Sequence, residues 1–232
     1  MIAQDRYRIV DSLGQGGMGE VCLADDLMLH RQVALKFLSS ADDSESSDQL
    51  LAEARAAAAL DHPFICSIYE VTAINDRPCI AMEYVRGETL ERRLRRGPLP
   101  LAEGLRVAEE IAEALEAAHK RRVIHRDLKP ANVMFREDQH IKVMDFGLAT
   151  RLPAGDEFHL DVSGMGAATN AVCGTPAYMA PEQIRGEPPD RRSDIFGFGV
   201  LLYELLSGTH PFCRIGVDAT FAAILGEPLT AL

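Results

Sequence analysis

Apolar and polar residues alternate over short stretches in the first third of the chain. Five such segments, separated by glycine or charged turns, are residues 7–13, 20–24, 32–38, 64–72 and 78–85. Short runs of this kind are typical of β-strands. Residues 39–48 are rich in Ser and Asp and predict a loop. The Ala-rich residues 49–60 predict a single helix that ends before Pro63.

The pattern changes after Gly87, and from there helices dominate. Seven apolar residues recur at helical spacing: Leu101, Leu105, Ala108, Ile111, Ala112, Leu115 and Ala118. Residues 195–206 and 218–225 predict two further helices. Residues 148–175 show no period and predict a long loop, which in a compact domain is usually functional or disordered.

The predicted fold class is therefore α+β, with two lobes of different character. The N-lobe, about residues 1–85, is rich in strands and has one helix, and the C-lobe, about residues 86–232, is mainly helical. A hinge is expected near residues 83–87, with a cleft between the lobes. Together the lobes form one domain over residues 1–232.

Composition narrows the function classes. The formal net charge of −11 argues against general nucleic-acid binding. The five cysteines are an odd number and scattered, so neither disulfides nor a zinc site are expected, and a reducing, cytoplasmic location is favoured. The chain contains no run of 18 apolar residues, so the sequence predicts no membrane-spanning helix in it.

A glycine-rich motif occupies residues 14–21, Gly14-Gln15-Gly16-Gly17-Met18-Gly19-Glu20-Val21. Glycines let a backbone turn tightly and approach phosphate closely. The same G-x-G-x-x-G spacing opens dinucleotide-binding βαβ units, which would indicate an oxidoreductase. Residues 20–24 follow a strand pattern and not a helical one. The motif is therefore predicted to link two strands as a flap over nucleotide phosphates.

Lys36 lies in an apolar strand, 17 residues after Gly19. A lysine in such a strand is usually on the solvent side, but here the returning strand would place its ammonium group under the flap, near α- and β-phosphate oxygens. A desolvated ammonium group needs a carboxylate partner. Glu53, in the Ala-rich helix, is the candidate, although a lone helical Glu is ordinarily solvated.

Two charged clusters complete a phosphoryl-transfer site: His125-Arg126-Asp127-Leu128-Lys129-Pro130-Ala131-Asn132 and Asp145-Phe146-Gly147. Asp127 is predicted to orient a hydroxyl and accept its proton. Asp145 and the amide oxygen of Asn132 are predicted to hold Mg²⁺, or Mn²⁺ as an alternative. Lys129 supplies positive charge near the transferred group.

In this order, and with Ala180-Pro181-Glu182 following, the motifs resemble the eukaryotic-type (Hanks-type) Ser/Thr protein kinase family in its bacterial branch. The resemblance runs from about Tyr7 to the C-terminus. It implies a bilobal protein-kinase-like fold, with a five-stranded N-lobe over a helical C-lobe. It also implies an ATP-dependent phosphotransferase that acts on protein hydroxyls in signalling and phosphorylates its own activation loop.

The resemblance further implies a nucleotide site. ATP would lie beneath residues 14–21, with its adenine between four apolar side chains, Leu13, Val21, Ala34 and Met134. Glu83 and Val85 would offer backbone hydrogen bonds at the hinge, next to Met82. The plain alternative for the apolar residues is core packing.

Substrate and regulatory residues follow from the same resemblance. Lys129 together with residues 174–178 resembles the Ser/Thr branch, with Thr175 bridging toward the catalytic Asp and Lys. Arg126 would pair with a phosphate on the activation loop, at Thr169 and less readily at Ser163. Asp194 would anchor the backbone before Asp127, or else simply cap a helix.

The implied partners are ATP, protein substrates with Ser or Thr, and a transient homodimer. The family continues for two more helices, so the chain is expected to be C-terminally truncated, with no partner for Glu182. Whether the intact protein carries a membrane anchor, as many relatives do, is left open by the sequence. An inactive, ATP-binding pseudokinase or fragment is the alternative. A small-molecule kinase is disfavoured by the peptide-docking segment at residues 174–182.

Overall fold

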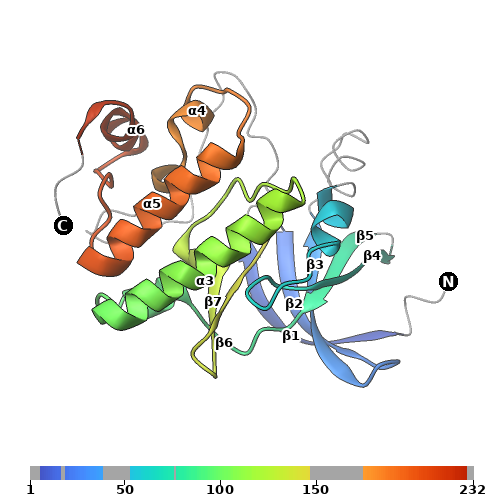
Figure 1. Ribbon diagram of the computed structural model, residues 1–232. Coiled ribbons are helices and arrows are strands. Elements are labelled where there is room, and N and C mark those ends of the chain that lie inside the picture. The colour runs from blue at the N-terminus through green and yellow to red at the C-terminus, as the bar shows by residue number, and fades with distance from the viewer. Residues whose placement is uncertain (1–5, 17–18, 39–52, 76, 147–174, 229–232) are drawn as a thin grey trace.

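The computed structural model describes residues 6–16, 19–38, 53–75, 77–146 and 175–228. Five strands form an antiparallel sheet in the order β1-β2-β3-β5-β4. They are β1 (Tyr7–Gly16), β2 (Gly19–Asp26), β3 (Arg31–Leu38), β4 (Ile68–Ile74) and β5 (Arg77–Glu83). The predicted β-rich N-lobe is confirmed, and Figure 1 shows it as one side of the molecule.

The burial of these strands follows their sequence pattern. In β2, Cys22, Ala24 and Asp26 are buried at alternate positions, as expected for a strand with one face on the core. β3 lies at the centre of the sheet, and its residues from Val33 to Leu38 are all buried. This continuous burial explains why β3 is an apolar run, in which Lys36 is the exception.

The predicted strand over residues 64–72 is only partly correct. Residues 68–74 form β4, whereas residues 64–66 pair with the C-lobe: Cys66 N donates to Val143 O at 2.9 Å, and Val143 N donates to Phe64 O at 2.8 Å. The apolar run over residues 64–72 thus pairs first with β8 of the C-lobe and then joins the N-lobe sheet as β4. The predicted helix is confirmed at residues 53–58, and its first residues lie outside the described ranges.

The C-lobe begins with a small sheet in the order β6-β7-β8. The elements in chain order are β6 (Gly87–Thr89), α2 (Leu90–Leu94), α3 (Leu101–Lys120), η1 (Pro130–Asn132), β7 (Val133–Arg136), β8 (Ile141–Val143), η3 (Thr175–Tyr178), α4 (Pro181–Ile184), α5 (Arg191–Ser207) and α6 (Val217–Gly226). In Figure 1, α3 lies between the N-lobe sheet and α5.

The largest core cluster joins α3 to α5, β7 and β8. Val107 and Ile111 of α3 are fully buried in it, together with Leu201 and Leu205 of α5. Leu101 and Leu105, which belong to the predicted apolar stripe, remain exposed. The predicted helix is therefore confirmed, but its buried face is narrower at the N-terminal end.

Helix α5 has defined signals at both ends. Asp190 is the N-cap residue, and its side chain accepts a hydrogen bond from Arg192 N at 2.7 Å, while Gly208 ends the helix in the left-handed conformation with φ of 74°. Within the helix, a Cβ on Gly197 would lie 3.4 Å from the carbonyl oxygen of Leu128. A Cβ at this position would make ordinary van der Waals contact with the loop that carries Asp127, so the packing of α5 on this loop does not itself require glycine.

Two expectations on cysteines and membranes can be compared with the structure. Cys22, Cys66 and Cys79 are buried free thiols, whereas Cys213 is disulfide-bonded, which corrects the expectation that no disulfide forms. Among the described helices, none has the length and apolar character needed to cross a membrane.

Candidate active site

The loop between α3 and β7 brings three of the predicted catalytic residues together. Lys129 Nζ lies 2.7 Å from Asp127 Oδ2, and Asn132 Nδ2 donates to the same oxygen at 3.0 Å. A second bond from Asn132 Nδ2 to the Asp127 carbonyl, at 2.8 Å, ties the two ends of the loop together. The Asp127 carboxylate is therefore held in one orientation beside a fixed cation.

Asp194 of α5 fixes the backbone that precedes Asp127. Its two carboxylate oxygens accept hydrogen bonds from the backbone N–H groups of His125 and Arg126, both at 2.8 Å. Arg126 has a φ of 69°, a conformation that costs free energy in a residue with a side chain. Asp194 offsets that cost, so it anchors the loop as the resemblance implies; the helix N-cap is Asp190.

His125 connects this loop to the segment that carries Asp145. The ring is fully buried, its Nδ1 accepts from Asp127 N at 3.2 Å, and its Nε2 lies 2.9 Å from Met144 O. These partners require a neutral ring with the proton on Nε2. The edge of the ring also meets Phe146, with centroids 4.8 Å apart. Asp127 and Asp145 are thus positioned relative to each other through one buried histidine.

The predicted pair between Lys36 and Glu53 is not present in the structure. Lys36 Nζ lies 2.8 Å from Asp145 Oδ1, and Glu53 Oε1 lies 2.5 Å from Arg126 Nη1. Lys36 therefore pairs with the carboxylate of Asp145, and the carboxylate of Glu53 pairs with the guanidinium group of Arg126. The physical reason is proximity: Asp145, with a φ of 58°, turns its side chain toward the buried ammonium group of β3, and the guanidinium of Arg126 reaches the helix at residues 53–58.

The glycine motif forms a hairpin between β1 and β2. Gly14, Gln15 and Gly16 lie in β1, and Gly16 pairs with Gly19, which has a φ of 120° and begins β2. No helix follows, so the feature that distinguishes the motif from a dinucleotide-binding βαβ unit is confirmed. Gly17 and Met18 lie outside the described ranges.

An apolar cluster lies between the sheet and the C-lobe, where adenine was predicted. Ala34, Met82 and Val85 are buried members, and Val21 and Met134 pack against them. The cluster thus contains three of the four residues predicted to enclose the base. The fourth, Leu13 at the end of β1, is 45% exposed and is not part of the cluster.

The sequence-based prediction missed further members of this cluster, among them Cys66 and Met144. Cys66 Sγ lies 3.6 Å from the carbonyl oxygen of Glu83 at the hinge, and burial raises the pKa of its thiol. Met144 was visible as the residue before Asp145, but nothing in the local pattern indicated which face it occupies. Both positions depend on the contact of residues 64–66 with β8.

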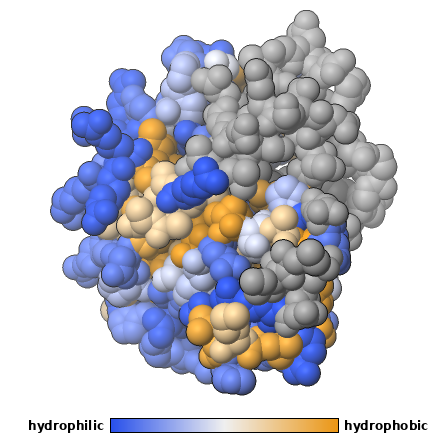
Figure 2. Space-filling model, turned by 90° about the vertical axis from the view of Figure 1, so that its right-hand side faces the viewer, coloured by the Kyte–Doolittle hydropathy of each residue, from blue (hydrophilic) through white to orange (hydrophobic). Residues whose placement is uncertain are grey.

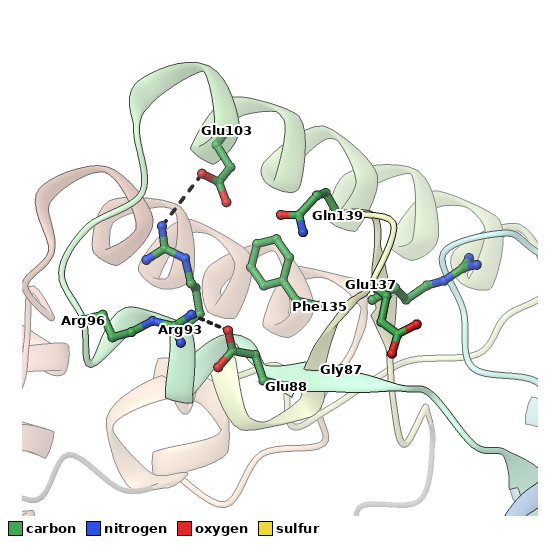
Figure 3. A pocket seen from close by; sticks show the side chains of 9 residues that line it. Gly87, Glu88, Arg93, Arg96, Glu103, Phe135, Glu137 and Gln139 are labelled. Atoms are coloured by element: carbon green, nitrogen blue, oxygen red, sulfur yellow. Dashed lines mark hydrogen bonds and ion pairs between the residues drawn. The ribbon is translucent and has the colours of Figure 1, made fainter.

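A separate hollow of about 360 Å³ lies beneath the small sheet of the C-lobe. Figure 3 shows Phe135 at its centre, with Arg93 paired to Glu103 and Arg96 paired to Glu88 around it. None of the predicted site residues lines it. Arg93 and Arg96 are paired with glutamates, so this hollow offers no excess positive charge for nucleotide phosphates. The cleft between the lobes therefore stays the candidate active site.

Comparison with known proteins agrees with this geometry. A family model described as "Protein kinase domain" matches residues 7–230. The chain belongs to this protein kinase family. The kinase domain is 41% identical over 210 residues to the serine/threonine-protein kinase PrkC of Bacillus subtilis, which covers 89% of this chain and 31% of that protein. It is also 41% identical to PknB of Mycobacterium leprae (90% of this chain, 33% of that protein) and 36% identical to pkn2 of Myxococcus xanthus (91% and 25%).

The kinase domain therefore spans about a third of the length of the first of these relatives. Its bilobal α+β fold is confirmed by the family match together with the N-lobe sheet and the helical C-lobe. The assignment of individual residues to catalysis or nucleotide binding stays a prediction, which the geometry above supports.

The segment at residues 175–184 packs against α5. The carboxylate of Glu182 accepts a hydrogen bond from Ser193 Oγ at 2.6 Å, which corrects the expectation that it has no partner. The backbone of Thr175 begins η3. The candidate phosphorylation sites Thr169 and Ser163, as well as Gly147, lie outside the described ranges.

Proposed function

We propose that this kinase domain is an ATP-dependent protein Ser/Thr kinase, which transfers the γ-phosphate of ATP to protein hydroxyl groups. The observation that carries the proposal is the group formed by Asp127, Lys129 and Asn132, which His125 connects to the segment that carries Asp145, the partner of Lys36. The relatives named above, which carry this activity in their names, support the same assignment.

In this proposal Asp127 handles the proton of the attacking hydroxyl. Its carboxylate is mostly buried, with 10% of the side chain exposed, and it is oriented by two donors. It would accept the hydroxyl proton as the new O–P bond forms and the bond to the leaving ADP breaks. Lys129, 2.7 Å away, would stabilise the negative charge on the transferred phosphoryl group.

The residues present fit a magnesium ion. Asp145 offers carboxylate oxygens, and Asn132 offers its amide oxygen because its Nδ2 group is committed to Asp127. Hard oxygen donors are what Mg²⁺ and Mn²⁺ prefer, and Mg²⁺ usually takes few protein ligands together with phosphate oxygens. When bound, the ion would neutralise phosphate charge. Lys36, paired with Asp145, would then be free to hold the phosphates.

The nucleotide base would occupy the apolar cluster. Ala34, Val21 and Met134 would enclose the adenine ring, with the Glu83 carbonyl and Val85 backbone at its polar edge. The glycine hairpin at the β1–β2 junction would cover the phosphates. Burial of a flat aromatic base between apolar side chains, with a few polar groups for orientation, is the common design of such sites.

The alternative is an ATP-binding pseudokinase, and one observation favours it. Glu53 is bonded to Arg126 and not to Lys36. We prefer the active kinase because Arg126 is the residue expected to bind a phosphate on Thr169. A doubly charged phosphate would compete with Glu53 for the guanidinium group and release Glu53 toward Lys36. Autophosphorylation of Thr169 would thus complete the site.

The test is autophosphorylation of the purified chain with radiolabelled ATP and Mg²⁺, beside the Asp127→Asn variant, followed by identification of the labelled amino acid. We expect label on Thr in the wild type alone, lost in a Thr169→Ala variant. If labelling requires transient homodimers, the initial rate per molecule rises with protein concentration. A folded wild type that binds ATP but incorporates no label would support the pseudokinase instead.

A further inference from the structure

The ammonium group of Lys142 on β8 is buried and bridges the two lobes. The residue is only 6% exposed, and its Nζ lies 2.9 Å from Glu83 Oε2 and 3.0 Å from the carbonyl oxygen of Ile65. Lysines are almost never buried to this extent unless they are paired. Lys142 belongs to the small C-lobe sheet, whereas Glu83 is the last residue of β5 in the N-lobe.

Glu83 is fixed through its backbone as well as its side chain. Its N–H donates to Ser67 O at 2.8 Å, and its carboxylate accepts from Ser67 N at 3.3 Å. Its carbonyl oxygen lies 3.6 Å from the thiol of Cys66. The first residue of the hinge is therefore held by the connection at residues 64–67, and that connection is itself bonded to β8.

The strand β8 supplies this restraint through both its backbone and a side chain. Val143 pairs with residues 64–66 through two backbone hydrogen bonds, and the neighbouring Lys142 adds the ion pair to Glu83. Lys142 does not line the apolar cluster proposed to hold adenine. Its effect on a nucleotide would therefore pass through its two partners, Glu83 and the connection at residues 64–67 that holds Glu83.

We infer that Lys142 is a positioning residue for ATP, which holds the Glu83 carbonyl where it accepts a hydrogen bond from the exocyclic amine of adenine. The inference rests on the proposed function, and it adds a residue outside the catalytic motifs. Removing one partner of a buried pair leaves the other charge unpaired, whereas removing both is much less damaging. Lys142→Met should therefore release Glu83 toward solvent and loosen the hinge backbone.

The experiment compares two nucleotides that differ only at the group in question: ATP and purine riboside triphosphate, which lacks the exocyclic amine. Dissociation constants with Mg²⁺ are measured by calorimetry for the wild type and for Lys142→Met. We expect the ATP constant to rise about tenfold and the constant for the analogue about twofold, since only ATP uses the Glu83 carbonyl. The matched control is Lys120→Met, which removes a lysine from the exposed pair with Glu116.

Two further variants separate positioning from a general structural role. Glu83→Gln keeps the size of the side chain but removes its charge, so it tests the same pair if Lys142→Met does not fold. The double variant should bind ATP better than Lys142→Met alone, because neither charge is left unpaired.

An equal loss for both nucleotides, or unchanged ATP binding in folded Lys142→Met and Glu83→Gln, would overturn the inference and leave the proposed function intact. A wild type that binds neither nucleotide would overturn both.

Discussion

The carboxylate of Asp127 has a cation on one side and an amide donor on the other, which fixes its direction in the cleft. Asp127→Asn keeps the shape but cannot accept a proton. We expect phosphorylation of a Thr-containing peptide to slow by about 10²–10⁴-fold, while ATP affinity changes by less than about twofold. Steady-state kinetics and nucleotide calorimetry measure the two effects. The control is Asp138→Asn, at an exposed ion pair with Arg136, and a large loss of ATP affinity would contradict the assigned role.

His210 makes folding stability depend on pH in a defined window. Its Nδ1 accepts hydrogen bonds from Phe212 N and Cys213 N, and burial lowers its pKa from 6.5 to about 4. The unfolded chain therefore binds the proton more tightly than the folded chain. Stability from this group is complete above pH 6.5 and declines as the pH falls toward 4.

We expect this decline to reach about 3 kcal/mol, from 1.36 kcal/mol for each unit of pKa difference. Urea unfolding of the wild type and of His210→Gln at several pH values measures it. Other groups titrate in both proteins, so the difference between the two curves isolates His210. Parallel curves from pH 7 to pH 4 would show that the ring is not buried in its neutral form.

At the scale of elements, α5 supports the loop that carries Asp127, and the stability of the helix should depend on its first turn. Asp190 caps the helix, and the Ser193 hydroxyl in return accepts from Asp190 N at 3.1 Å. Asp190→Ala should lower the free energy of unfolding, because it leaves the N–H group of Arg192 without that acceptor. Chemical denaturation measures the change. Glu187→Ala, three residues earlier at an exposed position, is expected to have almost no effect, and equal losses would contradict the capping role.

Elements with their own periodicity could be predicted from the sequence, but those created by distant pairing could not. The run that became β2 carried the alternation of a half-buried strand, β3 was a continuous apolar run, and α3 carried a helical stripe. β6 has only three residues and exists because Glu88 pairs with Phe135 of β7. No local pattern encodes such a partner.

The same distinction applies within the candidate site. Asp127, Lys129 and Asn132 lie within six residues, so their proximity followed from the motif. The motifs did not predict that Lys36 pairs with Asp145 and Glu53 with Arg126, because two cations and two carboxylates allow more than one pairing. Which pairing forms depends on the backbone at Asp145 and on the position of the helix at residues 53–58.

For the whole molecule, the cleft is formed where the sheet of the N-lobe meets the small sheet of the C-lobe. Residues 64–66 and β8 are bonded across this junction, and α3 and α5 support it from the other side. Figure 2 views the N-lobe side and shows apolar surface between hydrophilic side chains. The proposed catalytic groups are thus held by elements of both lobes, which suits a reaction that depends on positioning and electrostatics.

The net charge of the whole chain should influence which peptides it phosphorylates. At −11, the domain attracts cations, and this attraction is screened as the Debye length falls from about 30 Å at 0.01 M salt to about 8 Å at 0.15 M. We expect KM for a Thr peptide flanked by lysines to rise about threefold or more over that range, with KM for a peptide with neutral flanks nearly constant. Peptide kinetics at several salt concentrations measure both. If KM for a peptide flanked by glutamates rises as much as KM for the lysine peptide, salt acts on the enzyme itself and the prediction is wrong. If KM for the glutamate peptide falls as salt is added, the electrostatic field of the domain selects the substrate.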